Sequence, residues 1–312
     1  MKSIQINKYG GSDVVDINND VSIPRVSTGK VLVDVKAAGV NPVDWKIREG
    51  YFQQMVPLQF PATLGTDFSG IIKELEENAS TDFNIGDEVY GQGSPLSGGS
   101  GTFAEMVLTN IANVGLKPKT LNHIEASGLP LVGVSAWQAL VENIGLSKNQ
   151  KILIHGGAGG IGSIAIPLAR HLGAYVATTV KPDDKEFVQQ LKADEIVDYT
   201  AQSFEDILQD YDAALDTVGG ETYRKSFKVL KNNGTIVSML EQPDSNLMKQ
   251  YGVKSIFQFT ETTNERLTKL SQWIDQNNIK VNVEKTFPLT ETANALDYQK
   301  DNHPRGKVVI TL

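Results

Sequence analysis

Apolar and polar residues follow two different patterns along the chain. Up to residue 107 they alternate in short runs separated by glycine and proline, which is typical of β-strands with one buried face. From near residue 120 the chain instead shows short apolar runs separated by stretches of helical length. Such alternation predicts βαβ units and a parallel sheet. We therefore expect a β-rich part followed by an α/β part.

The elements that this pattern predicts can be given by residue number. In the first part, strands are expected at 3–7, 31–35, 71–72, 86–90 (after a turn) and 102–107, with a short helix beginning near 45 and a flexible loop at 91–101. In the second part, strands are expected at 151–154, 175–179, 195–197, 213–216 and 234–238, and helices at 124–144 and 161–172. A helix at 266–276 and a closing strand at 307–312 follow.

The turn after the strand at 151–154 carries the clearest chemical signal. Its glycines fit the spacing G-x-G-x-x-G, which allows a tight turn, close backbone approach to a pyrophosphate and close helix–strand contact. The N-terminus of the following helix presents free N–H groups and a partial positive charge to a phosphate. A plain tight turn is the alternative. The predicted phosphate-binding residues are Gly157, Ala158, Gly159, Gly160, Ile161 and Gly162.

Composition narrows the function classes. The 312 residues suggest about two domains, and 40% hydrophobic with 21% charged residues is ordinary for a soluble globular protein. The net charge of −8 and the lack of a basic run argue against nucleic acid as the main partner. There is no cysteine, no apolar N-terminal signal segment and no apolar run long enough to span a bilayer. We expect a cytoplasmic protein without a membrane partner.

Several short motifs, in their order along the chain, carry a family resemblance. They are Gly39-Val40-Asn41-Pro42-Val43-Asp44, Gly65-Thr66-Asp67-Phe68-Ser69-Gly70, Gly86-Asp87-Glu88-Val89, Gly101-Thr102-Phe103-Ala104-Glu105, Ser135-Ala136-Trp137-Gln138-Ala139-Leu140, the glycine turn, Leu215-Asp216-Thr217-Val218-Gly219-Gly220, and Gly306-Lys307-Val308-Val309. The whole chain resembles the zinc-independent branch of the medium-chain dehydrogenase/reductase superfamily, the quinone oxidoreductase (zeta-crystallin-like) group.

This resemblance implies an α/β fold of two domains. A GroES-like β-barrel catalytic domain would be built from residues 1–120 and 262–312. A Rossmann NADP-binding domain, with a doubly wound parallel sheet, would be inserted as residues 121–261. The resemblance also implies a cleft between the domains where nicotinamide meets substrate, and a homodimer formed through the Rossmann sheet edge near residues 255–260.

No metal site is expected. Zinc-dependent relatives need cysteine ligands, a histidine and a four-cysteine lobe, whereas this chain has no cysteine and four scattered histidines. Thr66 and Asp67 stand where the zinc branch has a His-Glu pair. His155, next to the glycines, is better explained as a packing or turn residue than as a catalytic acid.

The second strand of the nucleotide-binding part indicates which cofactor binds. NAD-binding units usually place an acidic residue at the end of that strand, but here it reads Ala177-Thr178-Thr179-Val180-Lys181. Hydroxyls and a lysine would donate to a 2′-phosphate, which a carboxylate would repel. The family also uses a tyrosine further on, which Tyr199 matches. We therefore predict NADPH, bound by Thr179, Lys181 and Tyr199, although Asp183 and Asp184 lie nearby.

Hydride transfer requires an oriented substrate more than a chemically powerful side chain. Asn41 is expected to donate to a substrate carbonyl or to the nicotinamide carboxamide, and Asp44 to orient the loop or a lysine; both could instead cap the helix that follows. Tyr51 is the leading phenol for proton delivery or substrate stacking, and its neighbours Trp45, Phe52 and Phe60 would form an aromatic lining. Thr66 offers a hydroxyl, and Thr217 belongs to the family's cofactor-side loop.

The predicted function is a metal-free, NADPH-dependent reduction of quinones or of the C=C bond of α,β-unsaturated carbonyl compounds. Reduction of saturated ketones or aldehydes is one alternative. A protein that binds NADPH without turnover, as a structural, sensor or RNA-associated protein, is the alternative from another class. Pro167 inside the helix at 161–172 and Glu241 at a strand end have no assigned role.

Overall fold

The computed structural model describes residues 1–76 and 82–312. The chain forms two compact units, residues 1–131 with 262–312 and residues 132–261. From the resemblance we expect domain boundaries after residues 120 and 261, whereas the compact units divide after residues 131 and 261. Helix α2 (His123–Ser127) accounts for part of this difference, because it packs against strands β3 and β5 of the first unit.

The first unit is built on two sheets. A three-stranded sheet has the order β2-β1-β4, with β1 (Ser3–Ile6), β2 (Val15–Asn18) and β4 (Ala62–Thr63). The larger sheet has the order β15-β16-β3-β5-β6-β8, with β7 also paired to β3. Its strands are β3 (Lys30–Val40), β5 (Asp67–Leu75), β6 (Glu88–Gln92), β7 (Met106–Asn110), β8 (Val114–Leu116), β15 (Val283–Pro288) and β16 (Lys307–Thr311). The other helices of this unit are α1 (Pro42–Arg48), α9 (Asn264–Asn277) and α10 (Thr292–Asp301).

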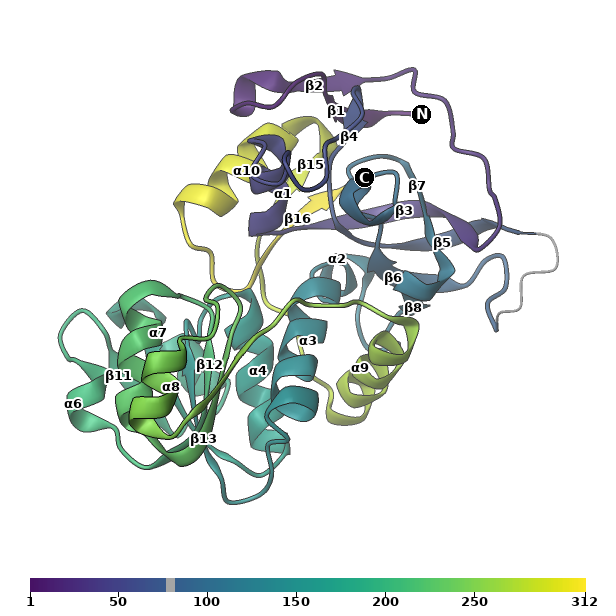
Figure 1. Ribbon diagram of the computed structural model, residues 1–312. Helices are drawn as coiled ribbons and strands as arrows, with labels where there is room; N and C mark the ends of the chain where they lie inside the picture. Colours follow the sequence, from purple (N-terminus) through teal and green to yellow (C-terminus); the bar gives the residue numbers. More distant parts are fainter. Residues whose placement is uncertain (77–81) are drawn as a thin grey trace. The chain divides into compact units, whose positions relative to one another are not determined.

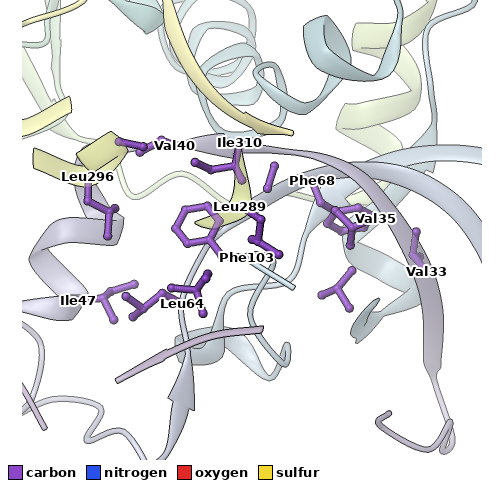
Figure 2. Close-up of a cluster of buried hydrophobic side chains, with 14 of the residues drawn as sticks. Val33, Val35, Val40, Ile47, Leu64, Phe68, Phe103, Leu289, Leu296 and Ile310 are labelled. Atoms are coloured by element: carbon purple, nitrogen blue, oxygen red, sulfur yellow. The ribbon is translucent and has the colours of Figure 1, made fainter. Parts of the chain in front are cut away.

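The C-terminal segment completes the core of this unit. Strand β16 pairs antiparallel with the end of β3, with Val308 opposite Val40. Ile310 and Leu296 join residues from β3, β5 and α1 in one buried cluster (Figure 2). Because both ends of the chain supply strands to one sheet, residues near 40 and near 307 lie side by side.

The second unit contains a six-stranded parallel sheet in the order β11-β10-β9-β12-β13-β14. Its strands are β9 (Lys151–His155), β10 (Tyr175–Val180), β11 (Glu195–Asp198), β12 (Tyr211–Asp216), β13 (Leu230–Ser238) and β14 (Lys254–Phe257). Its helices are α3 (Pro130–Trp137, which begins just before the boundary), α4 (Gly160–His171), α5 (Lys185–Gln190), α6 (Phe204–Ile207), α7 (Gly220–Ser226) and α8 (Ser245–Tyr251). Figure 1 shows α3 and α4 on one side of this sheet and α7 and α8 on the other. The predicted fold class is confirmed.

Short 3₁₀ helices and one π-helical segment complete the chain. They are η1 (Ser12–Val14), η2 (Pro95–Ser97), η3 (Ile111–Asn113), η5 (Pro182–Asp184), η6 (Phe227–Val229), η7 (Leu289–Glu291) and the π-helical η4 (Gln138–Asn143). Among the residues described, no helix has the length and apolar character needed to cross a membrane.

Four sequence-based elements differ from the structure. The short helix expected to begin near residue 45 begins at Pro42, whose fixed φ suits the first turn of a helix. The helix expected at 124–144 is divided into α2, α3 and η4, because Pro130 lacks the N–H that a continuous helix needs and instead begins α3. The strand expected at 102–107 begins only at Met106. Strand β5 begins at Asp67 rather than at Ile71. The apolar pattern missed its first residues because two of them, Asp67 and Ser69, are polar although buried.

Candidate active site

The glycine turn of the second unit is shaped as its sequence predicts. Gly156 has a φ of +69°, and a Cβ on Gly157 would collide with the Thr178 hydroxyl. A Cβ on Gly162 would collide with the backbone of Gly156. At Gly159, by contrast, an added Cβ would meet only the Gly156 carbonyl oxygen, at 3.4 Å. The turn is therefore closed where it packs on the sheet and open at Gly159, where a phosphate would approach.

Helix α4 supports the same use. Within the part of the chain that the structure describes, no side chain caps its N-terminus, so the N–H groups of its first turn are available to an anion. Pro167 lies well beyond this first turn, and α4 continues past it to His171. The residues present thus fit the pyrophosphate of a dinucleotide cofactor, which when bound supplies the hydride.

His155 holds a structural position at the end of β9. Burial lowers its pKa to about 4, so the ring is neutral. The Ser226 hydroxyl donates to the Thr222 carbonyl (2.6 Å), so Ser226 Oγ accepts from His155 Nε2 (2.9 Å). His155 Nδ1 must then accept from the Thr179 hydroxyl (3.0 Å). The packing role that the sequence favoured for His155 agrees with this arrangement.

This arrangement limits what Thr179 can do. Its hydroxyl has one proton, and His155 takes it. Thr179 is also buried, with 4% of its surface exposed. Its hydroxyl therefore cannot donate to a 2′-phosphate while His155 keeps this tautomer, contrary to the role that the sequence suggested. The prediction for Thr179 is reduced to a contact through its backbone or its methyl group.

A hollow of about 350 Å³ lies at the carboxyl ends of β10 and β11. Its lining consists of Val180, Lys181, Pro182, Lys185, Ile196, Asp198, Ala201 and Gln202. Two lysines thus face the space where the sequence placed the 2′-phosphate. Asp198 also lines it, but the N–H and the hydroxyl of Thr200 both donate to Oδ1 of this carboxylate (2.9 and 2.6 Å). Tyr199, which follows β11, is 58% exposed.

The loops after β12 and β13 are tied together by one buried carboxylate. Asp216 Oδ1 accepts from the N–H groups of Val218 (3.0 Å) and Gly219 (2.9 Å), and Oδ2 accepts from the Ser238 hydroxyl (2.7 Å). Thr217 Oγ1 donates to the His155 carbonyl (2.8 Å). The loop that carries Thr217 is therefore fixed at the carboxyl edge of the sheet, where α/β sheets bind their ligands.

Glu241 has a defined partner. Its Oε1 accepts from the Gly220 N–H (2.8 Å), the first residue of α7. A carboxylate at a helix N-terminus interacts favourably with the unpaired N–H groups there. Glu241 thus stabilises the start of α7 and holds the loop after β13 against it.

In the first unit, the predicted residues Asn41, Asp44 and Thr66 belong to one buried polar cluster. Asp44 Oδ2 accepts from the Asn41 N–H (2.7 Å), and Oδ1 accepts from the Thr66 hydroxyl (2.7 Å). Because Asp44 caps the start of α1, the helix-capping role is present. The Asn41 side chain is used differently, since Nδ2 donates to Asp67 Oδ2 (2.9 Å) and Oδ1 accepts from Lys307 Nζ.

Sequence reasoning missed Asp67 and Lys307 as members of this cluster. Lys307 is 3% exposed, and Nζ also donates to the Val40 carbonyl (2.8 Å). Asp67 Oδ1 accepts from Gln92 Nε2 (2.9 Å) and Oδ2 from the Leu131 N–H (3.1 Å). Both residues stood inside quoted family motifs, but no local pattern indicates that they are buried together.

The charges of the cluster are unbalanced. Two buried carboxyls, those of Asp44 and Asp67, interact electrostatically with one ammonium, that of Lys307. Burial raises the pKa of Asp44 to about 7, despite the hydrogen bond from Thr66. Burial also raises the pKa of Asp67 and lowers that of Lys307. All three groups are removed from water, and two negative charges face one positive charge. Binding of one additional proton by the cluster is therefore favoured.

The aromatic residues divide into two pairs. Tyr51 is 65% exposed, and its ring lies edge-on to Trp45 with 5.6 Å between centroids. Phe60 lies edge-on to Tyr9, at 5.0 Å. Phe52 packs against the core instead. The phenol of Tyr51 is thus accessible, and its role as a proton donor stays a prediction.

The described residues contain no group of three or more His, Asp or Glu side chains placed to hold a metal ion. The absence of cysteine from the whole sequence is independent of the structure. The metal-free site stays a prediction from these residues.

Comparison with known proteins places the chain among oxidoreductases. Residues 27–119 match a family model described as the alcohol dehydrogenase GroES-like domain, and residues 191–310 match one described as zinc-binding dehydrogenase. An NADPH-dependent alkenal/one oxidoreductase of Arabidopsis thaliana, described as chloroplastic, is 34% identical over 99% of this chain and 79% of its own length. A 2-methylene-furan-3-one reductase of Solanum lycopersicum is 33% identical over the same shares. The solved quinone oxidoreductase of Coxiella burnetii is 29% identical, covers 100% of this chain and 99% of its own, and superposes with a TM-score of 0.88.

Proposed function

The chain belongs to the zinc-independent quinone oxidoreductase family of the medium-chain dehydrogenases/reductases, and from this membership we propose that it is an NADPH-dependent reductase of quinones or of the C=C bond of α,β-unsaturated carbonyl compounds. The observation that carries the proposal is a pair of features at one parallel sheet. The glycine turn after β9 is open at Gly159, and a hollow lined by two lysines lies at the ends of β10 and β11. The relatives that act on alkenals and on a furanone favour an activated double bond as the substrate.

The residues of the chain have distinct tasks in this reaction. The first turn of α4 binds the pyrophosphate, and Lys181 with Lys185 binds the 2′-phosphate of NADPH. The bound cofactor supplies the hydride. Asn41 is fully buried, and one N–H of its carboxamide donates to Asp67. We propose that the other N–H orients a carbonyl. We also propose that Thr217 and Tyr199 complete the cofactor side, the roles expected for them from the family resemblance.

The cofactor part is tested by titrating NADPH and NADH against tryptophan fluorescence. Lys181→Ala should weaken NADPH binding about tenfold or more, because a charge-assisted hydrogen bond is lost, and should leave NADH binding unchanged. Lys249→Ala, an exposed lysine on α8, is the matched control. Equal binding of both cofactors by the wild type would contradict the proposed phosphate site.

The substrate part is tested by NADPH oxidation with a panel of quinones, enones and saturated aldehydes. We expect turnover with quinones or enones. Turnover with saturated aldehydes alone would favour the alternative reductase. Binding of NADPH without turnover of any member would favour a structural or sensor protein.

Location and assembly are further proposals of ours. We infer a cytoplasmic protein from the sequence, and a homodimer through β14, which ends the described path of the parallel sheet. Cell fractionation tests the first, and light scattering at micromolar concentration tests the second. A monodisperse monomer would contradict the dimer.

A further inference from the structure

The buried cluster of the first unit contains a hydrogen bond whose direction can reverse. Thr66 Oγ and Asp44 Oδ1 are 2.7 Å apart, a distance typical of an O–H···O bond in either direction. If Asp44 is ionised, the Thr66 hydroxyl donates to it. If Asp44 carries a proton on Oδ1, that proton is donated to Thr66, and the Thr66 hydroxyl is free to donate elsewhere.

Asp67 cannot serve in the same way. Its carboxylate accepts three hydrogen bonds, all from N–H groups, of Asn41, Gln92 and Leu131. A proton on an oxygen of Asp67 would compete with donors that cannot become acceptors. Asp44 accepts one bond from a backbone N–H and one from a hydroxyl. Only the hydroxyl can change from donor to acceptor, so the cluster's additional proton belongs on Asp44.

The surroundings of Asp44 supply the reason to keep that proton. The charged groups that act on it are Asp67 on β5 and Lys307 on β16, which leave a deficit of one positive charge. At the other end of α1, Arg48 is paired with Glu49 and with Asp297 of α10, so it does not neutralise this deficit. The pKa of about 7 for Asp44 agrees with a proton held at neutral pH.

We propose that Asp44 stores a proton and delivers it to the reduced substrate through the hydroxyl of Thr66. Asp44 has no exposed surface, whereas Thr66 keeps 5% of its surface exposed, so Thr66 is the member of the pair that is not fully enclosed. Thr66 is the catalytic residue of the pair, and Asp44 acts through it. This inference rests on the proposed reductase function and replaces Tyr51 as the proton donor.

The step balances for an enone. The substrate accepts a hydride at the β-carbon, and the electrons of the C=C bond move onto the carbonyl, giving an enolate. The Thr66 O–H bond breaks as its proton bonds to the enolate oxygen or α-carbon, and the Asp44 O–H proton moves to Thr66 Oγ. Asp44 is left as a carboxylate and takes a proton from water before the next cycle. For a quinone, the same proton goes to the hydroquinone anion.

The stored proton is tested by infrared spectroscopy of the protein without cofactor. A protonated carboxyl has a C=O band separate from that of a carboxylate. We expect a band that disappears with a midpoint near pH 7 and is missing in Asp44→Asn, which preserves both hydrogen bonds of the protonated form. Asp67→Asn should keep the band at pH 5 and lose it at a lower pH than the wild type. Thr66→Val should shift its frequency, because Asp44 loses its acceptor.

The delivery is tested by turnover. Thr66→Val should lower kcat about 10²-fold, the usual effect of a positioned general acid, with little change in KM. Thr66→Ser should restore it. Thr292→Val is the matched control, because it also removes a buried threonine hydroxyl. That hydroxyl donates to the Leu289 carbonyl and has no part in the proposed relay. Wild-type kcat and pH profile in Thr66→Val, or a comparable loss in Tyr51→Phe instead, would overturn the proposal.

The two proposals fail separately. If no substrate is reduced, the reductase function is wrong, while the infrared arm still decides the proton on Asp44. If the band is missing at neutral pH, is unchanged by Thr66→Val, or is removed by Asp67→Asn rather than Asp44→Asn, the relay is wrong even in an active reductase.

Discussion

Replacing Lys307 by methionine removes the single ammonium of the buried cluster. Nζ donates to the Val40 carbonyl and to Asn41 Oδ1, so the variant leaves two buried acceptors without donors. It also leaves Asp44 and Asp67 without a counter-charge. Breaking a buried charge arrangement by removing one partner costs about 3–5 kcal/mol. We therefore expect Lys307→Met to lower the free energy of unfolding of the first unit by about that amount.

A double-mutant cycle identifies the origin of the loss. Asp67→Asn removes one of the two negative charges, so in its presence Lys307→Met should cost about 2 kcal/mol less than it does alone. The penalty should also grow as pH rises from 5 to 8. At low pH, the carboxyls of Asp44 and Asp67 are protonated and need no positive partner. At high pH they must ionise in the Lys307→Met variant without the lysine ammonium.

Urea unfolding in a Trp137→Phe background measures this effect. Trp45 and Trp273 lie in the first unit and Trp137 in the second, so fluorescence then reports on the first unit alone. Lys36→Met, which breaks an exposed ion pair on β3, is the control and should cost less than about 1 kcal/mol. A loss below 1 kcal/mol for Lys307→Met, or additive single effects, would refute the reasoning.

Three further outcomes follow from the site. Gly157→Ala should lower the free energy of unfolding by about 1–3 kcal/mol, because its Cβ collides with Thr178. Gly159→Ala should weaken NADPH binding without this loss of stability. Urea unfolding measures the first effect and cofactor titration the second. Glu241→Gln should lower stability by about 0.3–1 kcal/mol through the start of α7, measured by thermal unfolding with and without added salt. Asp44 has a folded-state pKa above its ordinary value, so stability should fall as pH rises from about 4 to 7, and Asp44→Asn should show a smaller decline.

Local patterns were sufficient for the nucleotide-binding turn. The apolar runs at 151–154 and 175–179 predicted β9 and β10, because a buried parallel strand is recognised by its own residues. The glycine spacing predicted the turn for the same reason, since each glycine answers a steric demand within a few residues. The break at Pro130 in the helix expected at 124–144 is also a local signal, because proline lacks the N–H that a continuous helix needs.

Long-range partners could not be predicted in this way. Lys307 reaches Asn41 across 266 positions of sequence, and Asp67 reaches it across 26. Nothing in the neighbourhood of either residue indicates that its charge is removed from water. Thr179 gives the converse case, because its hydroxyl suited a phosphate by composition but is used by His155. Side-chain hydrogen bonds between distant segments decide both outcomes.

The same buried charges perform two tasks on neighbouring groups. Lys307 fixes Asn41 Oδ1 as an acceptor and Asp67 fixes one N–H of Asn41 Nδ2, so the remaining N–H has a single direction in which to donate. In our proposal, the imbalance between these charges keeps a proton on Asp44, which lies 2.7 Å from the Thr66 hydroxyl. A buried set of this kind costs stability that apolar residues of similar volume would not. We infer that the cluster is retained despite its lower stability because a substrate that accepts a hydride needs both an oriented hydrogen-bond donor, here Asn41, and a proton, here the one proposed on Asp44.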